Sequence, residues 1–259
     1  MKKIWLDLRL LIIMTIALTC SSTALSKQFN VLLFSKTAGW HHKSIPAGVN
    51  AIEKLAIKHH FNMIWHEEAS YFNDKFLQKI DVVIFMLTTG DVLDQKQQNA
   101  LMKFIRSGKG FVGIHSASDT EGSWPWYQQL VGRTFKIHPK VQTAQLQTVD
   151  NKFPGMSHIP DKLLWTDEWY DFSSEKSPNL NYLLTVDESS YDTHSDWGEH
   201  KTGNGMGKFH PIAWYQNFDG GRSFYTSLGH LNAVYENPIF LAHLYGGIYW
   251  AATNKGISK

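Results

Sequence analysis

The sequence "GKGFVGIHSASDT", residues 108–120, has the form of a buried strand that runs into a tight turn. Its apolar run, residues 111–114, leads directly to His115 and Ser116, and small polar residues follow. In many α/β enzymes a turn of this kind displays a nucleophilic serine or cysteine at the end of the strand. Here the displayed residue is a histidine, so we expect His115 to take part in proton transfer or metal binding.

Short apolar runs alternate with amphipathic segments on either side of this stretch. Ser44 and Asp94 stand where helix N-caps are expected, and Gly108 stands where the second helix should end. This β-α-β-α order predicts an α/β fold with a doubly wound, mostly parallel sheet and helices on both faces. Ligands bind such sheets at the carboxyl ends of the strands, where His115 lies. The strands expected in this half are residues 29–35, 61–65, 81–87 and 110–115.

The second half of the chain is richer in strands and adds them to the same sheet. No linker separates it from the first half, so residues 27–259 are predicted to form a single domain. A last helix is expected from Asn237 to about Ala252, and the polar stretch 189–208 is expected to be a surface loop. The expected strands are residues 140–149, 163–172, 181–188, 210–218 and 222–230, the last of which ends in His230.

Residues 1–26 have the features of a secretory signal peptide. A basic start precedes an apolar core, and a small-x-small cleavage site ends at Ser26. The apolar core, residues 10–18, is too short to span a bilayer, which takes about 20 apolar residues. A lipid anchor at Cys20 is disfavoured because Thr19 stands where a lipoprotein signal has Gly or Ala. We therefore predict a periplasmic or secreted protein whose mature part has no cysteine and no thiol nucleophile.

Charge and composition narrow the class of partner. The chain has 25 basic and 23 acidic residues with no basic stripe, which argues against a nucleic-acid partner. An aromatic share of 14%, with 10 tryptophans, is compatible with a carbohydrate ligand because aromatic faces stack on sugar rings. No nucleotide cofactor is expected. The sequence leaves the oligomeric state open, with a homo-oligomer as one option.

Three further stretches, together with the histidine turn, resemble the ThuA (trehalose-utilisation) family. They are "FSKTAGWHHKSIPAG" at 34–48, "TDEWY" at 166–170 and "GRSFYTSLGH" at 221–230, and the similarity covers about residues 28–253. The resemblance implies the three-layer sandwich of class I glutamine amidotransferases, a flavodoxin-like arrangement with extra strands, and a small-molecule carbohydrate ligand. It also places His115 where those enzymes carry the catalytic cysteine, so thioester chemistry on glutamine is excluded.

The resemblance further implies a site built from histidines and one carboxylate. His115, His230 and Glu168 are the expected catalytic residues. Without a metal, His115 and His230 would act as a general acid–base pair. With one, His42, His115 and His230, or two imidazoles with a carboxylate, would hold a single divalent ion such as zinc. The sequence does not separate these alternatives, because its histidines lack the i, i+4 spacing of a strong metal motif. The residues expected to bind substrate are Trp40, His42, Ser116, Asp119, Trp124, Trp126, His138 and Tyr170.

We expect an exported carbohydrate-processing enzyme that acts on a glycoside or a keto-sugar derivative. Proton abstraction next to a carbonyl, leading to isomerisation or elimination, fits two histidines better than direct glycoside hydrolysis, which usually requires two opposed carboxylates. The alternatives are a non-catalytic sugar-binding protein on the same scaffold and an interaction module that uses the loop 189–208. For Trp124 and Trp126 the choice is between a pocket rim, where they would stack on a sugar, and the core.

Overall fold

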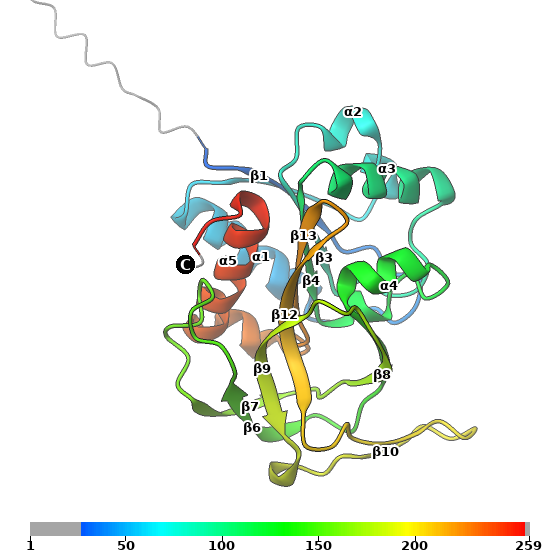
Figure 1. The fold of residues 1–259 in the computed structure, drawn as a ribbon, viewed down its shortest axis with the longest axis vertical. Coiled ribbons are helices and arrows are strands. Elements are labelled where there is room, and N and C mark those ends of the chain that lie inside the picture. Colours follow the sequence, from blue (N-terminus) through cyan, green and yellow to red (C-terminus); the bar gives the residue numbers. More distant parts are fainter. Residues whose placement is uncertain (1–26, 257–259) are drawn as a thin grey trace, which may run out of the picture.

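The computed structural model describes residues 27–256, in which a nine-stranded sheet runs through the middle of the molecule (Figure 1). The predicted signal peptide and Cys20 lie outside the described residues. The sheet draws strands from both halves of the chain, in the order β2-β1-β3-β4-β13-β12-β9-β6-β7. In that order the strands are β2 (Asn62–His66), β1 (Asn30–Phe34), β3 (Val82–Met86), β4 (Gly110–Ile114), β13 (Gly221–Thr226), β12 (His210–Phe218), β9 (Asn181–Asp187), β6 (Gln142–Thr148) and β7 (Lys162–Asp167).

The sheet has two parts that differ in strand direction. In the parallel half, formed by β2, β1, β3, β4 and β13, each neighbouring pair is parallel. In the antiparallel extension, formed by β12, β9, β6 and β7, each neighbouring pair is antiparallel, and β12 also pairs with β13 in this way. The predicted α/β fold with a large sheet is confirmed, and the strands of the second half make that sheet a mixed one.

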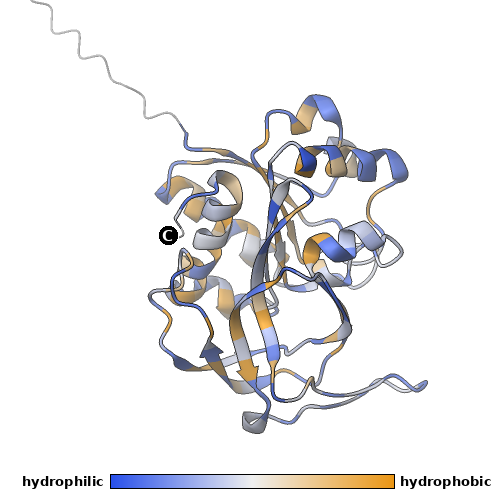
Figure 2. Cartoon of the chain, in the orientation of Figure 1, coloured by the Kyte–Doolittle hydropathy of each residue, from blue (hydrophilic) through white to orange (hydrophobic). Residues whose placement is uncertain are grey.

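Helices cover both faces of the parallel half. Successive residues of a strand point to opposite faces, so Val31 and Leu33 pack on the side of α1 and α5, and Leu32 and Phe34 on the side of α2, α3 and α4. Figure 2 shows hydrophilic residues on the outward side of α2 and α3. The helices are α1 (Ile45–Lys58), α2 (Asp74–Leu77), α3 (Gln95–Arg106), α4 (Pro125–Val131) and α5 (Pro238–Thr253).

The helix caps expected from the sequence are present at two of the three starts. Asp94 accepts a hydrogen bond from the backbone N–H of Gln97, whose side chain accepts the backbone N–H of Asp94, and the two form a capping box. Asn237 caps α5 by accepting a backbone N–H of its first turn. Ser44 differs, because its hydroxyl donates to the carbonyl oxygen of Gly229 at 3.2 Å. That bond ties the start of α1 to the loop after β13.

The strand predicted over residues 163–172 is divided into two. After β7 the chain turns away and forms β8 (Asp171–Lys176), which pairs with β5 (Arg133–Ile137) in a separate two-stranded sheet. The sequence hides this break because aromatic residues continue the strand-like pattern across it. The break matters for function, since it places residues 168–170 over the carboxyl edge of the parallel half, where Glu168 contacts two histidines.

Other boundaries also differ from the prediction. β13 ends at Thr226, so His230 lies in the loop that follows the strand and not at its tip. The helix α4 and the strand β5 are not predicted from the sequence. The stretch 189–208 contains a small antiparallel hairpin, formed by β10 (His194–Asp196) and β11 (Thr202–Asn204).

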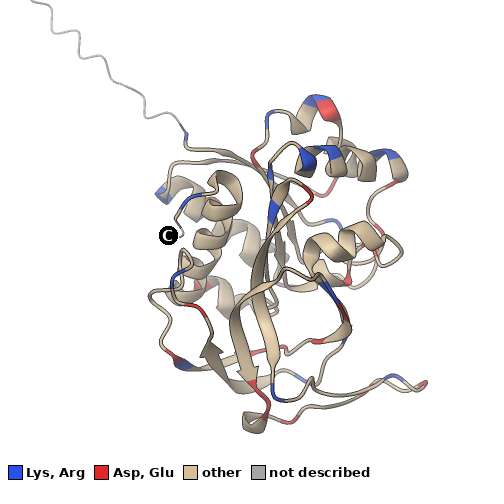
Figure 3. Cartoon of the chain, in the orientation of Figure 1, with Lys and Arg blue, Asp and Glu red and all other residues tan. Residues whose placement is uncertain are grey.

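Charged side chains of both signs are interspersed, mainly on α2, α3 and the loops (Figure 3). Two of the buried carboxylates, Asp167 and Glu168, are neighbours in the chain at the end of β7. Within residues 27–256, no helix is both long and apolar enough to cross a membrane. Asp167 and Glu168 are thus an exception to the surface position of most charged side chains, and Glu168 contacts the predicted histidines.

Candidate metal centre

His115 occupies the turn at the end of β4 in a strained backbone conformation. Its φ of +53° lies in the left-handed region, which is uncommon for a residue with a side chain. Such a conformation costs about 1–3 kcal/mol and persists only where its surroundings enforce it. Here the hydroxyl of Tyr225 donates to the carbonyl oxygen of His115 at 2.7 Å, and the imidazole is fully buried. The predicted turn is present, with its histidine turned into the protein.

The hydrogen bonds of His115 determine which ring nitrogen is free to bind a ligand. Its Nδ1 lies 2.7 Å from the carbonyl oxygen of Ser227, and because a carbonyl only accepts, Nδ1 carries the hydrogen. In the neutral ring Nε2 then offers a lone pair. That atom lies 2.8 Å from the hydroxyl of Tyr170 and 3.3 Å from Oε2 of Glu168. Metal-binding histidines commonly have this arrangement, with the second ring nitrogen held by a carbonyl.

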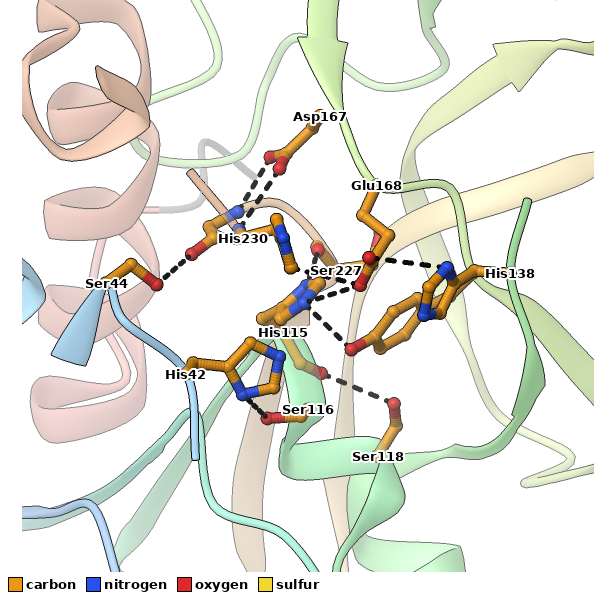
Figure 4. A network of polar contacts seen from close by, with 12 residues as sticks. His42, Ser44, His115, Ser116, Ser118, His138, Asp167, Glu168, Ser227 and His230 are labelled. Carbon is orange, nitrogen blue, oxygen red and sulfur yellow. Dashed lines mark hydrogen bonds and ion pairs between the residues drawn. The ribbon is translucent and has the colours of Figure 1, made fainter. Parts of the chain in front are cut away.

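Glu168 lies among three imidazoles (Figure 4). Its Oε2 is 3.3 Å from Nε2 of His115 and 3.1 Å from Nδ1 of His230, and its Oε1 is 3.3 Å from Nδ1 of His138. Burial would raise the pKa of this carboxyl, but the contacts from His115 and His230 outweigh burial and hold the pKa of Glu168 well below its usual range. Glu168 is therefore ionised at neutral pH in a buried place, which requires compensating positive charge nearby.

His230 is positioned through its backbone. The buried carboxylate of Asp167 accepts the N–H of Gly229 at 2.8 Å and the N–H of His230 at 3.1 Å. The Nδ1 atom of His230 is buried and lies 3.1 Å from Oε2 of Glu168, yet it makes no hydrogen bond of good geometry. Burial opposes protonation of His230, but the carboxylate of Glu168 outweighs it and raises the pKa. A buried ring nitrogen without a hydrogen bond is an available ligand atom.

His42 reaches the same place from the loop after β1. It is 4% exposed, and its Nδ1 lies 3.4 Å from the hydroxyl of Ser116. The centre of its ring lies 5.0 Å from that of His115 and 5.5 Å from that of His230. Burial, followed by the charges of these two neighbours, lowers the pKa of His42 to about 3. His42 is therefore neutral near pH 7, as a metal ligand must be.

Four donor atoms of this group fit a single divalent ion. We call the group the His/Glu cluster; one ligand atom from each member lies within 4.8 Å of all the others. Three imidazole nitrogens and a carboxylate oxygen suit Zn²⁺ and similar ions, at about 2.0–2.2 Å per bond. In tetrahedral coordination two such ligands lie about 3.4 Å apart, so the widest pair would have to close by up to about 1.4 Å when an ion binds. Glu168 is thus a fourth candidate ligand beside the three predicted histidines. The members are His42, His115, Glu168 and His230.

The His/Glu cluster borders a pocket of about 350 Å³ with largely aromatic walls. Asp119 also lines it, and burial raises the pKa of this carboxyl to about 6 against the opposing effect of His115, although the side chain still reaches solvent. A larger cavity of about 630 Å³ lies between α1 and α5, away from the cluster. The lining residues of the smaller pocket are Trp40, His42, Asp119, Phe135, His138, Glu168, Tyr170, Trp197 and His230.

Five of the eight predicted substrate-binding residues line this pocket, and Ser116, Trp124 and Trp126 do not. Ser116 is in contact with the ring of His42. The rings of Trp124 and Trp126 stack on each other with centroids 5.1 Å apart, and Nε1 of Trp126 donates to Asp219 at 2.7 Å. Asp219 lies in the turn between β12 and β13, at the opposite edge of the sheet from the cluster. The predicted sugar contact of these two tryptophans is therefore corrected: they pack on the protein's own aromatic residues.

Sequence reasoning missed Phe135, Trp197 and Asp167. Phe135 lies on β5, a short strand without clear alternation, and Trp197 lies in the stretch interpreted as a surface loop. Asp167 belongs to a quoted motif, but only the fold brings its carboxylate to the backbone of Gly229. The one sequence signal that could have identified Trp197 is its position as a lone tryptophan in an otherwise polar loop.

Fold and site together define an α/β protein with a histidine–carboxylate centre at the carboxyl edge of a large mixed sheet. The chain belongs to the ThuA family, described as trehalose utilisation, whose family model matches residues 30–251. The resemblance carried by the sequence motifs is thus confirmed. Membership in this family implies a role in trehalose utilisation or carbohydrate processing.

Solved structures share the fold at low sequence identity. A protein described as ThuA-like from Bacteroides uniformis has a TM-score of 0.72 at 18% identity, covering 88% of this chain and 93% of that chain. A similarly described protein from Parabacteroides merdae has a TM-score of 0.68 at 19% identity, with 89% and 92% covered. A β-galactosidase from Bacillus circulans has a TM-score of 0.50 at 14% identity, covering 84% of this chain and 30% of its own. No curated protein matches the sequence.

Proposed function

We propose that this protein is a metal-dependent enzyme that processes carbohydrates. The observation that carries the proposal is the His/Glu cluster, whose four donor atoms lie within 4.8 Å of one another beside an aromatic-lined pocket. A divalent ion bound there would polarise a substrate carbonyl and stabilise the enediolate that forms when a neighbouring proton is removed. Family membership in trehalose utilisation supports a sugar as the substrate.

The groups that remain to move protons are His138 and Asp119, which line the same pocket. Burial lowers the pKa of His138 below its ordinary value, although Glu168 opposes this, so the ring is neutral near pH 7 and can accept a proton. With a pKa of about 6, the carboxyl of Asp119 is protonated in about a tenth of the molecules at pH 7 and can donate one. These two residues are our candidates for the base and the acid.

Acid–base catalysis by His115 and His230 alone is a less favoured mechanism. Both imidazoles face the same carboxylate oxygen of Glu168, and the Nδ1–H of His115 is already bound to a carbonyl oxygen. These contacts favour a ligand-holding role for both rings.

Proton abstraction next to the carbonyl of a keto-sugar is favoured over direct glycoside hydrolysis. Hydrolysis usually needs two opposed carboxylates, one on each side of the glycosidic bond. Asp119 and Glu168 both line the pocket, but Glu168 is surrounded by three imidazoles and is not available as a free nucleophile or base. An isomerase or lyase reaction therefore fits the residues better.

The experiment is a search for hydrogen exchange and turnover. The zinc-loaded protein is incubated in D₂O with a panel of keto-glucosides, and NMR follows the signal of the proton next to the carbonyl. We expect exchange or elimination with at least one member, and its loss in His138→Gln or Asp119→Asn. Sugars that bind without exchange or turnover would instead support the non-catalytic sugar-binding protein.

We also propose that the protein is exported and that its parallel half is doubly wound in the flavodoxin manner. Export is supported by the basic start, apolar core and cleavage site of residues 1–26. The winding is supported by the strand order β2-β1-β3-β4-β13 with helices on both faces. N-terminal sequencing of the protein from the periplasm or medium tests export, with a start at Lys27 as the expected result.

A further inference from the structure

Trp197 lies at the pocket with its indole held in place and half exposed. The residue is 49% exposed, and its Nε1 donates to the carbonyl oxygen of His138 at 3.1 Å. Its ring also lies edge-on to the ring of His138, with centroids 4.8 Å apart, and 6.0 Å from that of Phe135. A large apolar side chain that is oriented by the protein yet open to solvent at a pocket marks a ligand-binding surface.

The hairpin that carries Trp197 is tied to the backbone of the site. The carboxylate of Glu188 accepts two backbone N–H groups from the segment after β11 and lies 2.8 Å from Nδ1 of His210. The Nε2 atom of His210 donates to the carbonyl oxygen of Tyr170 at 2.8 Å. Tyr170 follows Glu168 by two positions, and its ring lines the pocket. The position of the indole is therefore built into the fold.

Trp40 lines the same pocket from the parallel half. It is 70% exposed and lies two positions before His42. Its carbonyl oxygen accepts the hydroxyl of Thr89 at 2.9 Å, and that hydroxyl accepts the N–H of Gly39 at 3.2 Å. These bonds fasten the loop to the segment after β3. The pocket thus has two exposed indoles, one from the loop after β1 and one from the hairpin of β10 and β11.

We propose that Trp40 and Trp197 form an aromatic subsite for a second sugar ring, so that the site takes a glycoside of at least two rings in preference to a monosaccharide. This inference rests on the proposed carbohydrate function. At about 350 Å³ the pocket lies at the lower end of the usual range for ligand sites, and with one ring beside the His/Glu cluster the exposed indoles of the same lining offer contact to a second ring. The C–H face of a pyranose is apolar, and a rigid indole offers it a large contact area.

Isothermal titration calorimetry on the mature protein tests this subsite. The ligands are trehalose, maltose and cellobiose, with glucose as the one-ring reference. We expect at least one disaccharide to bind about tenfold more tightly than glucose, because one aromatic contact contributes up to about 1.4 kcal/mol of binding free energy. Trp197→Ala and Trp40→Ala should each weaken disaccharide binding more than glucose binding, and so reduce that preference. Trp65→Ala is the matched control, because Trp65 is 43% exposed on the edge strand β2 and is not among the pocket residues.

The outcomes separate this inference from the proposed function. If no disaccharide binds more tightly than glucose, or if both tryptophan variants bind like wild type, the subsite is overturned even where zinc binds and turnover is seen. A disaccharide preference that depends on Trp197 in a protein without metal affinity would support the subsite and overturn the metal-dependent enzyme. Thermal melts of each variant, together with Trp197→Phe, which keeps a ring, exclude loss of folding as the cause.

Discussion

The parallel half and the antiparallel extension contribute different chemistry to one site. The parallel half supplies the imidazoles of His42, His115 and His230, each from a segment that follows a parallel strand. The extension supplies the carboxylate of Glu168, and the segment leading into it supplies the ring of His138. Parallel strands deliver their ends to one edge of a sheet, so topology alone gathers the histidines. The carboxylate arrives only because the chain breaks between β7 and β8.

Replacing Glu168 removes the ligand of the extension and leaves those of the parallel half. For Glu168→Gln we expect zinc affinity to fall at least about 100-fold, because even outer partners of metal ligands are worth about 10–100-fold. Titration of the metal-free protein with zinc measures the change. His138→Gln is the matched control, since His138 contacts Glu168 from outside the cluster, and it should cost less. Equal affinity in Glu168→Gln and wild type would remove Glu168 from the ligand set.

Asp167 links the two parts, because this residue of β7 holds the loop after β13. In Asp167→Ala the N–H groups of Gly229 and His230 lose their acceptor, at about 1–3 kcal/mol for the buried group of Gly229 and less for the part-buried group of His230. We expect the free energy of unfolding in urea to fall by about 2–4 kcal/mol. Asp167→Asn keeps one acceptor oxygen and should lose less. A variant as stable as wild type would show that the loop is held by other contacts.

His243 lies in the core and His230 in the candidate site, and the two environments shift their pKa values in opposite directions. Glu168 raises the pKa of His230, whereas burial lowers the pKa of His243, on α5, to about 3. A histidine in the unfolded chain has a pKa of about 6.5, so below that pH His243 binds a proton in the unfolded chain but stays neutral in the folded protein. Stability present above pH 6.5 is therefore lost on acidification, by about 1.5 kcal/mol between about pH 6.5 and pH 5.

His243→Gln removes this titration and leaves that of the site. Urea unfolding at several pH values should give a flatter stability profile for His243→Gln than for wild type below about pH 6.5. His158→Gln is the control, since it makes the same substitution at an exposed position. Parallel profiles for His243→Gln and wild type would show that the buried imidazole does not set the acid limit.

The smallest effect concerns the strained turn at the end of β4. Glycine adopts positive φ without a steric penalty, so His115→Gly should be more stable than His115→Ala by about 1 kcal/mol. Both variants lose the imidazole of His115, so the difference between their midpoints of unfolding measures the cost of the backbone conformation. A more stable alanine variant would mean that the turn relaxes once the imidazole is removed.

The parallel half was predictable from sequence to a greater extent than the extension. Continuous apolar runs such as residues 82–86 and the cap at Asp94 are local signals, and their outcome matches the prediction. The end of β7 has no local signal in the sequence, because it depends on the hydrogen bond between Asp167 and the backbone of Gly229, which is far away in the chain. Family motifs pointed to Glu168, but its contacts with three imidazoles depend on that break.

The remaining misses have the same physical origin. Trp197 was assigned to a surface loop because nothing local shows that Glu188 and His210 fasten its hairpin to the site. Trp124 and Trp126 were expected at a pocket because they follow the histidine turn, yet they stand at the start of α4 and neither lines the pocket. Local patterns predict elements, whereas long-range hydrogen bonds decide which side chains meet.

The most direct test of the metal centre is elemental analysis of the mature protein, purified without chelator or affinity metal, beside the His115→Ala variant. We expect about one divalent ion per chain in the wild type and its loss in the variant, because His115 supplies one of four ligands. An ion retained in His115→Ala, or wild-type protein that takes up none even when zinc is supplied, would contradict a metal centre at the junction of the two parts of the sheet.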